Sequence, residues 1–134
     1  MNGQRVLVTG GSGFIGGALV GSLRDETDLR MLDIDPGPDP PDGVHLIEGD
    51  VRDQQTVDEA AAGVDVIFHQ AALVSVEESI ADPIESNAVN AAGTLRVLEA
   101  ARRHDARVVV ASSAAIYGEP EHVPATETDP LVPT

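Results

Sequence analysis

The sequence predicts an α/β protein built on a doubly wound parallel sheet. Its strand-like runs are too apolar for a sheet with one solvated face, and helix-like segments separate most of them. A glycine-rich turn lies between the first strand-like run and the first helix-like segment. The 134 residues suffice for one domain with a hydrophobic core and are too few for two ordinary domains. The expected order of elements is therefore β-α-β-loop-β-α-β-α-β.

The first strand is expected at residues 6–8, and the turn follows it directly. Two glycine patterns overlap in this turn: Gly11-x-Gly13-x-x-Gly16 and, after Thr9, Gly10-x-x-Gly13-x-x-Gly16. Such glycines let the backbone turn tightly and approach a pyrophosphate, which the positive end of the following helix attracts. In that helix, apolar residues recur at helical spacing at Ile15, Leu19 and Leu23. A tight turn without a ligand is the alternative interpretation.

A carboxylate ends the second expected strand, residues 29–32. Asp33 lies 20 residues after Gly13, where dinucleotide-binding proteins place an acid that accepts hydrogen bonds from the adenosine ribose hydroxyls. A turn-forming acid at the start of the next loop is the alternative. The proline-rich stretch 35–43 can form neither helix nor strand, because proline removes backbone donors and fixes φ, so it should be a loop.

The middle of the chain continues the alternation of strands and helices. The third strand is expected at residues 44–48, followed by a helix with Asp53 as its N-cap and Gly63 at its end. The apolar positions of this helix are Val57, Ala60 and Ala61. The fourth strand is expected at residues 64–68.

The longest helix should begin at residues 82–83, after a loop through Ser75, because aspartate caps helices and proline is tolerated in a first helical turn. Its basic residues 102–104 suit the negative end of the helix dipole. Its expected buried stripe is Ile84, Ala88, Ala91, Leu95 and Leu98. A fifth strand is expected at residues 107–112, and an irregular segment from residue 118 onward.

The charge balance of the chain is strongly acidic. It has 23 Asp and Glu against 8 basic residues, a formal net charge of −15, and every basic residue is arginine. This argues against a nucleic-acid partner, because phosphate binding needs a surface rich in lysine and arginine. The scattered acids indicate either a solvated surface or adaptation to a cytoplasm rich in salt, where screening relieves self-repulsion.

Cysteine is absent, which excludes disulfides, thiolate metal sites and cysteine nucleophiles, and we expect no bound metal. No apolar stretch approaches the about 20 residues that span a bilayer, and no charged-then-apolar leader precedes Val6. We therefore expect a soluble, cytoplasmic protein without a membrane partner.

Eight short motifs occur along the chain: Thr9-Gly-Gly-Ser-Gly-Phe-Ile-Gly16, Asp33, Gly49-Asp-Val51, His69-Gln-Ala-Ala72, Asp82-Pro83, Asn90-Ala-Ala-Gly-Thr94, Leu98-Glu-Ala-Ala101 and Ser112-Ser-Ala-Ala-Ile-Tyr-Gly118. Each is weak alone, but their order and spacing are specific. Together they resemble the extended short-chain dehydrogenase/reductase family, the NAD-dependent sugar epimerases and dehydratases, and most of all its UDP-sugar 4-epimerase-like members. The resemblance implies a Rossmann fold, NAD as cofactor, a nucleotide-sugar substrate for the full-length protein, and compatibility with a homodimer.

The resemblance also assigns cofactor-binding roles. The pyrophosphate would lie on the glycine turn and the first helical backbone N–H groups, at Gly10, Gly13, Phe14, Ile15 and Gly16. Asp33 would hold the adenosine ribose. Asp50 would accept a hydrogen bond from the adenine amino group, and the backbone of Val51 would complete that contact. Ala71 and Ala72 would line the bridge between the two nucleotides.

For three polar residues the resemblance leaves an alternative open. Ser113, four residues before Tyr117, matches the catalytic serine that hydrogen-bonds the reacting sugar hydroxyl, or else it caps a turn. Asn90 matches a cofactor-site asparagine of the family's long helix, or else it only satisfies backbone groups. His69 fits a structural histidine at a strand end better than a catalytic base.

The chain departs from the family pattern in the catalytic pair. Relatives use a tyrosine followed four residues later by a lysine, which lowers the tyrosine pKa so that it can take the proton. This chain has no lysine, and Glu121 stands four residues after Tyr117, its only tyrosine. In relatives the pair lies just beyond a segment that resembles residues 130–134.

We therefore expect an N-terminal part of an epimerase or dehydratase, with its sheet truncated after the fifth strand. Residues 1–118 would form the NAD-binding domain, and 119–134 an irregular segment leading toward the catalytic part. The chain as it stands would bind NAD without turnover. The alternatives are a non-catalytic NAD-binding sensor or interaction module, and a structural partner with a vestigial site.

Overall fold

One five-stranded sheet organises the computed structural model, which describes residues 3–37, 41–120 and 122–133. The strands are β1 (Arg5–Thr9), β2 (Asp28–Asp33), β3 (Val44–Glu48), β4 (Val66–His69) and β5 (Arg107–Val110). Their order across the sheet is β3-β2-β1-β4-β5, and every neighbouring pair is parallel. The doubly wound parallel sheet expected from the sequence is confirmed. Residues 38–40 of the proline-rich loop, and Glu121, lie outside the described residues.

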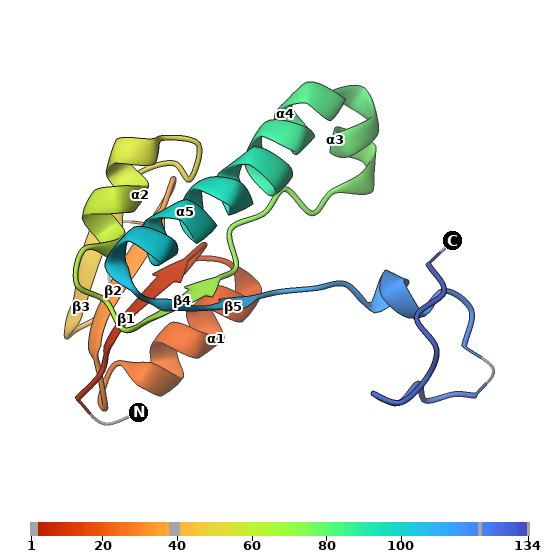
Figure 1. Cartoon of the computed structure of the whole chain (residues 1–134), viewed down its shortest axis with the longest axis horizontal. Helices are drawn as coiled ribbons and strands as arrows, with labels where there is room; N and C mark the ends of the chain where they lie inside the picture. Colours follow the sequence, from red (N-terminus) through yellow and green to blue (C-terminus); the bar gives the residue numbers. More distant parts are fainter. Residues whose placement is uncertain (1–2, 38–40, 121, 134) are drawn as a thin grey trace.

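Helices cover both faces of the sheet (Figure 1). α1 (Phe14–Leu23) lies on one face, and α2 (Gln54–Ala61) lies with α5 (Thr94–His104) on the other. Three short segments lead into α5: α3 (Val76–Ala81), α4 (Pro83–Asn87) and a π-helical turn, η1 (Ala88–Gly93). Helical crossovers of this kind are what parallel neighbouring strands require.

Each face of the sheet buries its own hydrophobic cluster. Successive residues of β1 point to opposite faces, so Leu7 packs with α2 and α5 while Val6 and Val8 pack with α1. The larger cluster comprises Leu7, Leu32, Val51, Val57, Ala60, Ala61, Val64, Ile67, Val97, Ala100 and Ala101. The smaller comprises Val6, Val8, Val20, Leu29 and Met31. The apolar positions expected on α2 are therefore buried.

The helix boundaries expected from capping residues are confirmed. Asp53 accepts a hydrogen bond from the Gln55 N–H at 2.9 Å at the start of α2, and Gly63 follows its end with φ of +71°. Asp82 accepts from the Glu85 N–H at 2.9 Å, with Pro83 in the first turn of α4. The basic residues 102–104 form the last turn of α5.

The apolar stripe expected on the long helix exists but faces away from the sheet, so that expectation was wrong. Ile84 and Leu95 are 82% and 60% exposed. Smaller residues face the sheet instead, at Gly93, Val97, Ala100 and Ala101. A Cβ on Gly93 would lie 2.9 Å from a Val51 methyl group, so a small residue lets the helix approach this closely. Periodicity alone does not show which of two stripes is turned inward.

Two short helices were not expected. α3 has six residues, too few to show a helical period, and begins after Ser75, whose Oγ accepts from the Glu78 N–H at 3.2 Å. The 3₁₀ turn η2 (Ala114–Tyr117) lies in the segment after β5, which leads away from the sheet (Figure 1). Throughout the described ranges, none of the helices combines the length and apolarity needed to cross a membrane.

Candidate functional site

A cavity lies where the strand order reverses, beside the ends of β1 and β4. Doubly wound sheets bind ligands in the crevice at this point, outside the carboxyl ends of the strands. A cavity of about 530 Å³ opens here. Its wall includes Gly10, Gly13, Asp33, Asp50, Val51, Arg52, Ala71, Ala72, Glu78 and Glu85. The structure thus brings together residues that the resemblance assigned to pyrophosphate, ribose and adenine, while Phe14, Ile15 and Gly16 begin α1 beside it.

The glycine turn at the end of β1 is packed too tightly to accept side chains. Gly10 has a φ of +67°, and a Cβ on it would lie 2.6 Å from the backbone nitrogen of Ala71. A Cβ on Gly16 would overlap the carbonyl oxygen of Gly10. The Gly10 N–H donates to the Leu32 carbonyl at 2.8 Å, which ties the turn to the end of β2. These contacts give the glycine pattern a structural reason beyond any ligand.

The start of α1 carries no side-chain cap. Its N-cap residue is Gly13, whose N–H donates to the Gly10 carbonyl at 3.1 Å. The Phe14 side chain is 99% exposed and points away from the core. An uncapped helix start beside a cavity is the arrangement in which backbone N–H groups bind phosphate.

Asp33 stands at the rim of the cavity and is fixed by backbone donors. Its Oδ2 accepts from the Ser12 N–H at 2.9 Å, and its Oδ1 accepts from the Asp35 N–H at 3.1 Å. The first bond joins the end of β2 to the glycine turn. A carboxylate oxygen has two acceptor positions, so each oxygen retains one that can accept from a hydroxyl group.

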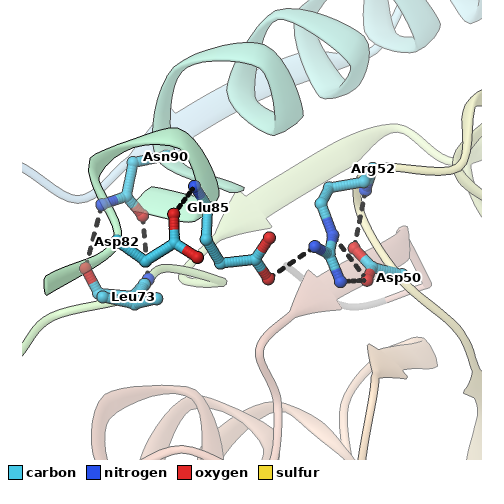
Figure 2. A network of polar contacts seen from close by, with 6 residues as sticks. All are labelled: Asp50, Arg52, Leu73, Asp82, Glu85 and Asn90. Atoms are coloured by element: carbon cyan, nitrogen blue, oxygen red, sulfur yellow. Dashed lines mark hydrogen bonds and ion pairs between the residues drawn. The ribbon is translucent and has the colours of Figure 1, made fainter. Parts of the chain in front are cut away.

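Asp50 lines the same cavity, in the turn after β3, and is held by Arg52 (Figure 2). Oδ1 accepts from the Arg52 backbone N–H at 2.8 Å, while Oδ2 accepts from Nε at 2.8 Å and from Nη2 at 2.5 Å. The hydrogen-bonded guanidinium holds the pKa of the Asp50 carboxyl below its usual value. The side chain is therefore an ionised acceptor at neutral pH.

The same guanidinium reaches α4. Its Nη1 donates to Glu85 Oε1 at 2.5 Å, so Arg52 bridges the turn after β3 and the helix that follows Asp82 (Figure 2). Both Arg52 and Glu85 line the cavity, and neither was expected there. The signal for Arg52 was its place directly after the Asp50-Val51 motif, as one of few cations in an acidic chain. Nothing in the sequence distinguishes Glu85 from other surface acids.

Asn90 acts on the loop that forms one wall of the cavity. Its Oδ1 accepts from the Leu73 N–H at 2.8 Å, and its Nδ2 donates to the Leu73 carbonyl at 2.9 Å (Figure 2). The side chain thus satisfies both backbone groups of one loop residue from within η1. Asn90 also lines a second, smaller cavity, so the cofactor role assigned by resemblance stays a prediction.

The second cavity, of about 380 Å³, lies between β4, η1 and the end of β5. His69 is 3% exposed there; its Nδ1 is 2.7 Å from Thr9 Oγ1 and its Nε2 2.9 Å from Thr94 Oγ1. The Thr94 hydroxyl donates to the Asn90 carbonyl at 2.6 Å, so it accepts from Nε2–H, and Nδ1 accepts from Thr9. Burial also lowers the pKa of His69, which favours this neutral form.

Ser113 lines the second cavity and not the first. It is exposed, and its Oγ accepts from the Ala115 N–H at 3.2 Å, which caps η2. This bond matches the structural alternative for Ser113, and the catalytic role assigned by resemblance stays a prediction. Tyr117 ends the same 3₁₀ turn. Across the three described ranges, no group of three or more His, Asp or Glu is placed to hold a metal ion.

A family model for the NAD dependent epimerase/dehydratase family matches residues 6–134. The chain belongs to this family. NAD, the cofactor expected from the sequence, is thus the cofactor that defines the family. A putative UDP-glucose 4-epimerase of Methanocaldococcus jannaschii is 35% identical over 96% of this chain and 44% of its own length. A dTDP-glucose 4,6-dehydratase of Mycobacterium tuberculosis is 34% identical over 88% of this chain and 39% of its own length.

Solved structures of the epimerase/dehydratase family share the fold. A UDP-glucose 4-epimerase of Thermus thermophilus, in complex with NAD, has a TM-score of 0.79 and 39% identity over 96% of this chain and 44% of that one. The enzyme of Bifidobacterium longum, in complex with NAD⁺ and UDP, has a TM-score of 0.81 and 33% identity over 97% and 43%. The chain spans less than half the length of the relatives it matches.

Proposed function

We propose that this chain forms the NAD-binding portion of a nucleotide-sugar epimerase or dehydratase. The observation that carries the proposal is the convergence of the glycine turn, Asp33 and Asp50 on one cavity at the switch point. Three separate strand ends supply them, in the arrangement that dinucleotide-binding sheets use. Related structures are solved with NAD, and some with UDP or a UDP-sugar.

In this proposal the pyrophosphate lies over the glycine turn and the uncapped start of α1. Asp33 accepts from the adenosine ribose hydroxyls, and Asp50 accepts from the adenine amino group beside the Val51 backbone. Ala71 and Ala72, which line both cavities, form the bridge from the adenosine to the nicotinamide side. Ser113 would then face the reacting sugar hydroxyl in the second cavity.

Bound NAD supplies the transient hydride transfer of this reaction class. The residues of this chain contribute binding and orientation, since the family's tyrosine and lysine pair has no lysine here. Loss of an acid/base group alone lowers a rate by about 10²–10⁴-fold. We infer that the chain as it stands binds NAD and does not interconvert sugars. The same proposal includes three further points. The NAD-binding domain ends at residue 118, the longer protein forms a homodimer, and the protein works in a salt-rich cytoplasm.

Calorimetric titration of NAD into the purified 134-residue chain tests the binding half. Interconversion of UDP-glucose and UDP-galactose, with added NAD, tests the catalytic half. We expect binding without turnover. Turnover by this chain alone would show that another residue, with Tyr117 as the first candidate, serves as the base. Failure of a demonstrably folded chain to bind NAD would overturn the proposal.

The absence of lysine also favours a second candidate, an NAD-binding sensor or interaction module without chemistry. The coding sequence after Thr134 distinguishes the two. A Tyr-x-x-x-Lys motif encoded shortly downstream in frame supports the enzyme, whereas a stop codon directly after Thr134 supports the module.

A further inference from the structure

Asp50 has little acceptor capacity left once Arg52 is bound. A carboxylate offers about four acceptor positions. Arg52 fills two on Oδ2 through Nε and Nη2, and one on Oδ1 through its backbone N–H. One position remains, on Oδ1. The carboxylate therefore cannot rotate without breaking three hydrogen bonds.

Glu85 completes this arrangement from the far side of the guanidinium. It accepts from Nη1 at 2.5 Å, so the fork of Arg52 lies between two carboxylates that line the same cavity (Figure 2). Glu85 itself is positioned by the start of α4, where Asp82 accepts from its backbone N–H. Lysine could replace the guanidinium only in part, because an ammonium lacks the planar fork that spans two partners.

We propose that Arg52, held by Glu85, is a positioning residue that makes Asp50 selective for a base with an amino group at the adenine N6 position. The inference rests on the proposed NAD-binding function. An ionised carboxylate with one fixed free position accepts from an N–H₂ group and repels a carbonyl oxygen. Without Arg52 the carboxylate can turn, so its negative charge is no longer fixed against the base, and it discriminates less between an amino group and a carbonyl oxygen.

The probe is a pair of cofactors that differ only in the purine, at the C6 substituent and in the proton that hypoxanthine carries on the adjacent N1. Nicotinamide hypoxanthine dinucleotide carries a carbonyl oxygen where NAD carries the amino group. We expect the unmodified chain to prefer NAD by about ten- to hundredfold, the range for one hydrogen bond to a charged group. Arg52→Ala should reduce the preference to about threefold or less, Arg52→Lys should restore it only in part, and Glu85→Gln should have a smaller effect.

Arg102→Ala is the matched control, because Arg102 makes an equally forked pair with Glu99 on an exposed face of α5. It should leave the preference unchanged, and thermal melting of every variant shows which are folded. If Arg52→Ala is unfolded, Arg52→Lys and Glu85→Gln decide the outcome. NAD binding with the full preference retained in the folded Arg52 variants overturns this inference and leaves the proposed function standing. A folded unmodified chain that binds neither cofactor overturns both.

Discussion

The two cavities at the carboxyl edge of the sheet differ in charge and in how they are walled. Four carboxylates and one guanidinium line the first, at Asp33, Asp50, Arg52, Glu78 and Glu85. Among the residues that the structure describes, no carboxylate or guanidinium group lines the second cavity, and the His69 side chain that lines it is buried and neutral. The first is walled by residues of β2, α3, α4 and η1 and by the turns that follow β1, β3 and β4, whereas Ser113 reaches the second from an exposed segment after β5.

The polar groups of the two cavities also differ in what they bind. Asp33 and Asp50 are immobilised by backbone and guanidinium donors before any ligand is present, which is the preorganisation that favours binding. In the second cavity the hydrogen bonds of His69 and Asn90 are used up by the protein itself. In the proposed function, the first cavity is therefore the preorganised part of the site, whereas in the second the hydrogen bonds of His69 and Asn90 hold the fold.

The largest expected effect concerns Asp33 and the choice between NAD and NADP. The ribose phosphate of NADP would meet the Asp33 carboxylate as like charge, at a cost of about 4 kcal/mol for unit charges ~4 Å apart at an effective dielectric near 20. That corresponds to about three decades in affinity. Calorimetry should show NAD preferred by this order, and Asp33→Ala should narrow the gap. Equal affinities in the unmodified chain would remove Asp33 from the ribose site.

The next largest effect is on stability, and it tests how tightly the glycine turn of the first cavity is packed. Gly10→Ala should destabilise the chain by about 3 kcal/mol, because alanine resists a positive φ and its Cβ would strike the Ala71 backbone. Urea denaturation measures the change. Gly21→Ala is the control: this helical position has open space around it, so alanine should stabilise by up to about 1 kcal/mol. Similar stabilities for the two variants would contradict the close approach.

A pH titration tests the second cavity through His69. Its pKa is lowered in the folded chain, so its contribution to the free energy of unfolding is complete above the unfolded pKa of about 6.5. That contribution is lost as the pH falls from there toward the folded pKa, by up to about 1.4 kcal/mol per pH unit. His69→Gln, which cannot titrate, should flatten this part of the stability profile. His122→Gln, in the C-terminal segment, controls for the loss of a histidine. If the free energy of unfolding changes with pH at the same slope in His69→Gln and in the unmodified chain, His69 does not titrate as inferred.

The smallest and least local effect concerns salt. With a formal charge of −15, the chain should gain thermal stability between low salt and molar potassium chloride, because screening weakens self-repulsion. Melting followed by circular dichroism measures it, and sodium chloride at equal ionic strength should act alike. High salt should also not weaken NAD binding, because it screens the repulsion between the carboxylates of the first cavity and the pyrophosphate. A flat melting profile would leave solubility as the only reason for the acidic composition.

Local physics explains which features were predictable from the sequence. Mostly apolar runs identified all five strands, because strands of a parallel sheet covered by helices are rich in apolar residues. The pattern is clearest in the buried β1 and weaker in β3 and β5 at the edges of the sheet. Asp53 and Asp82 predicted where two helices begin, and the glycine turn predicted a positive φ. These features were predictable because caps and backbone sterics act within a few residues. The strand and motif order then indicated where Asp33 and Asp50 would meet.

Tertiary packing decided the features whose partners are distant in sequence. Arg52 and Glu85 are 33 residues apart, His69 and Thr9 are 60 apart, and each pair forms only because two elements dock. The inward face of the long helix was decided in the same way: Gly93 allows close approach to Val51, so the larger apolar side chains were left outside. Composition and periodicity describe one element at a time, whereas a hydrogen bond between elements depends on the distance and angle at which they pack.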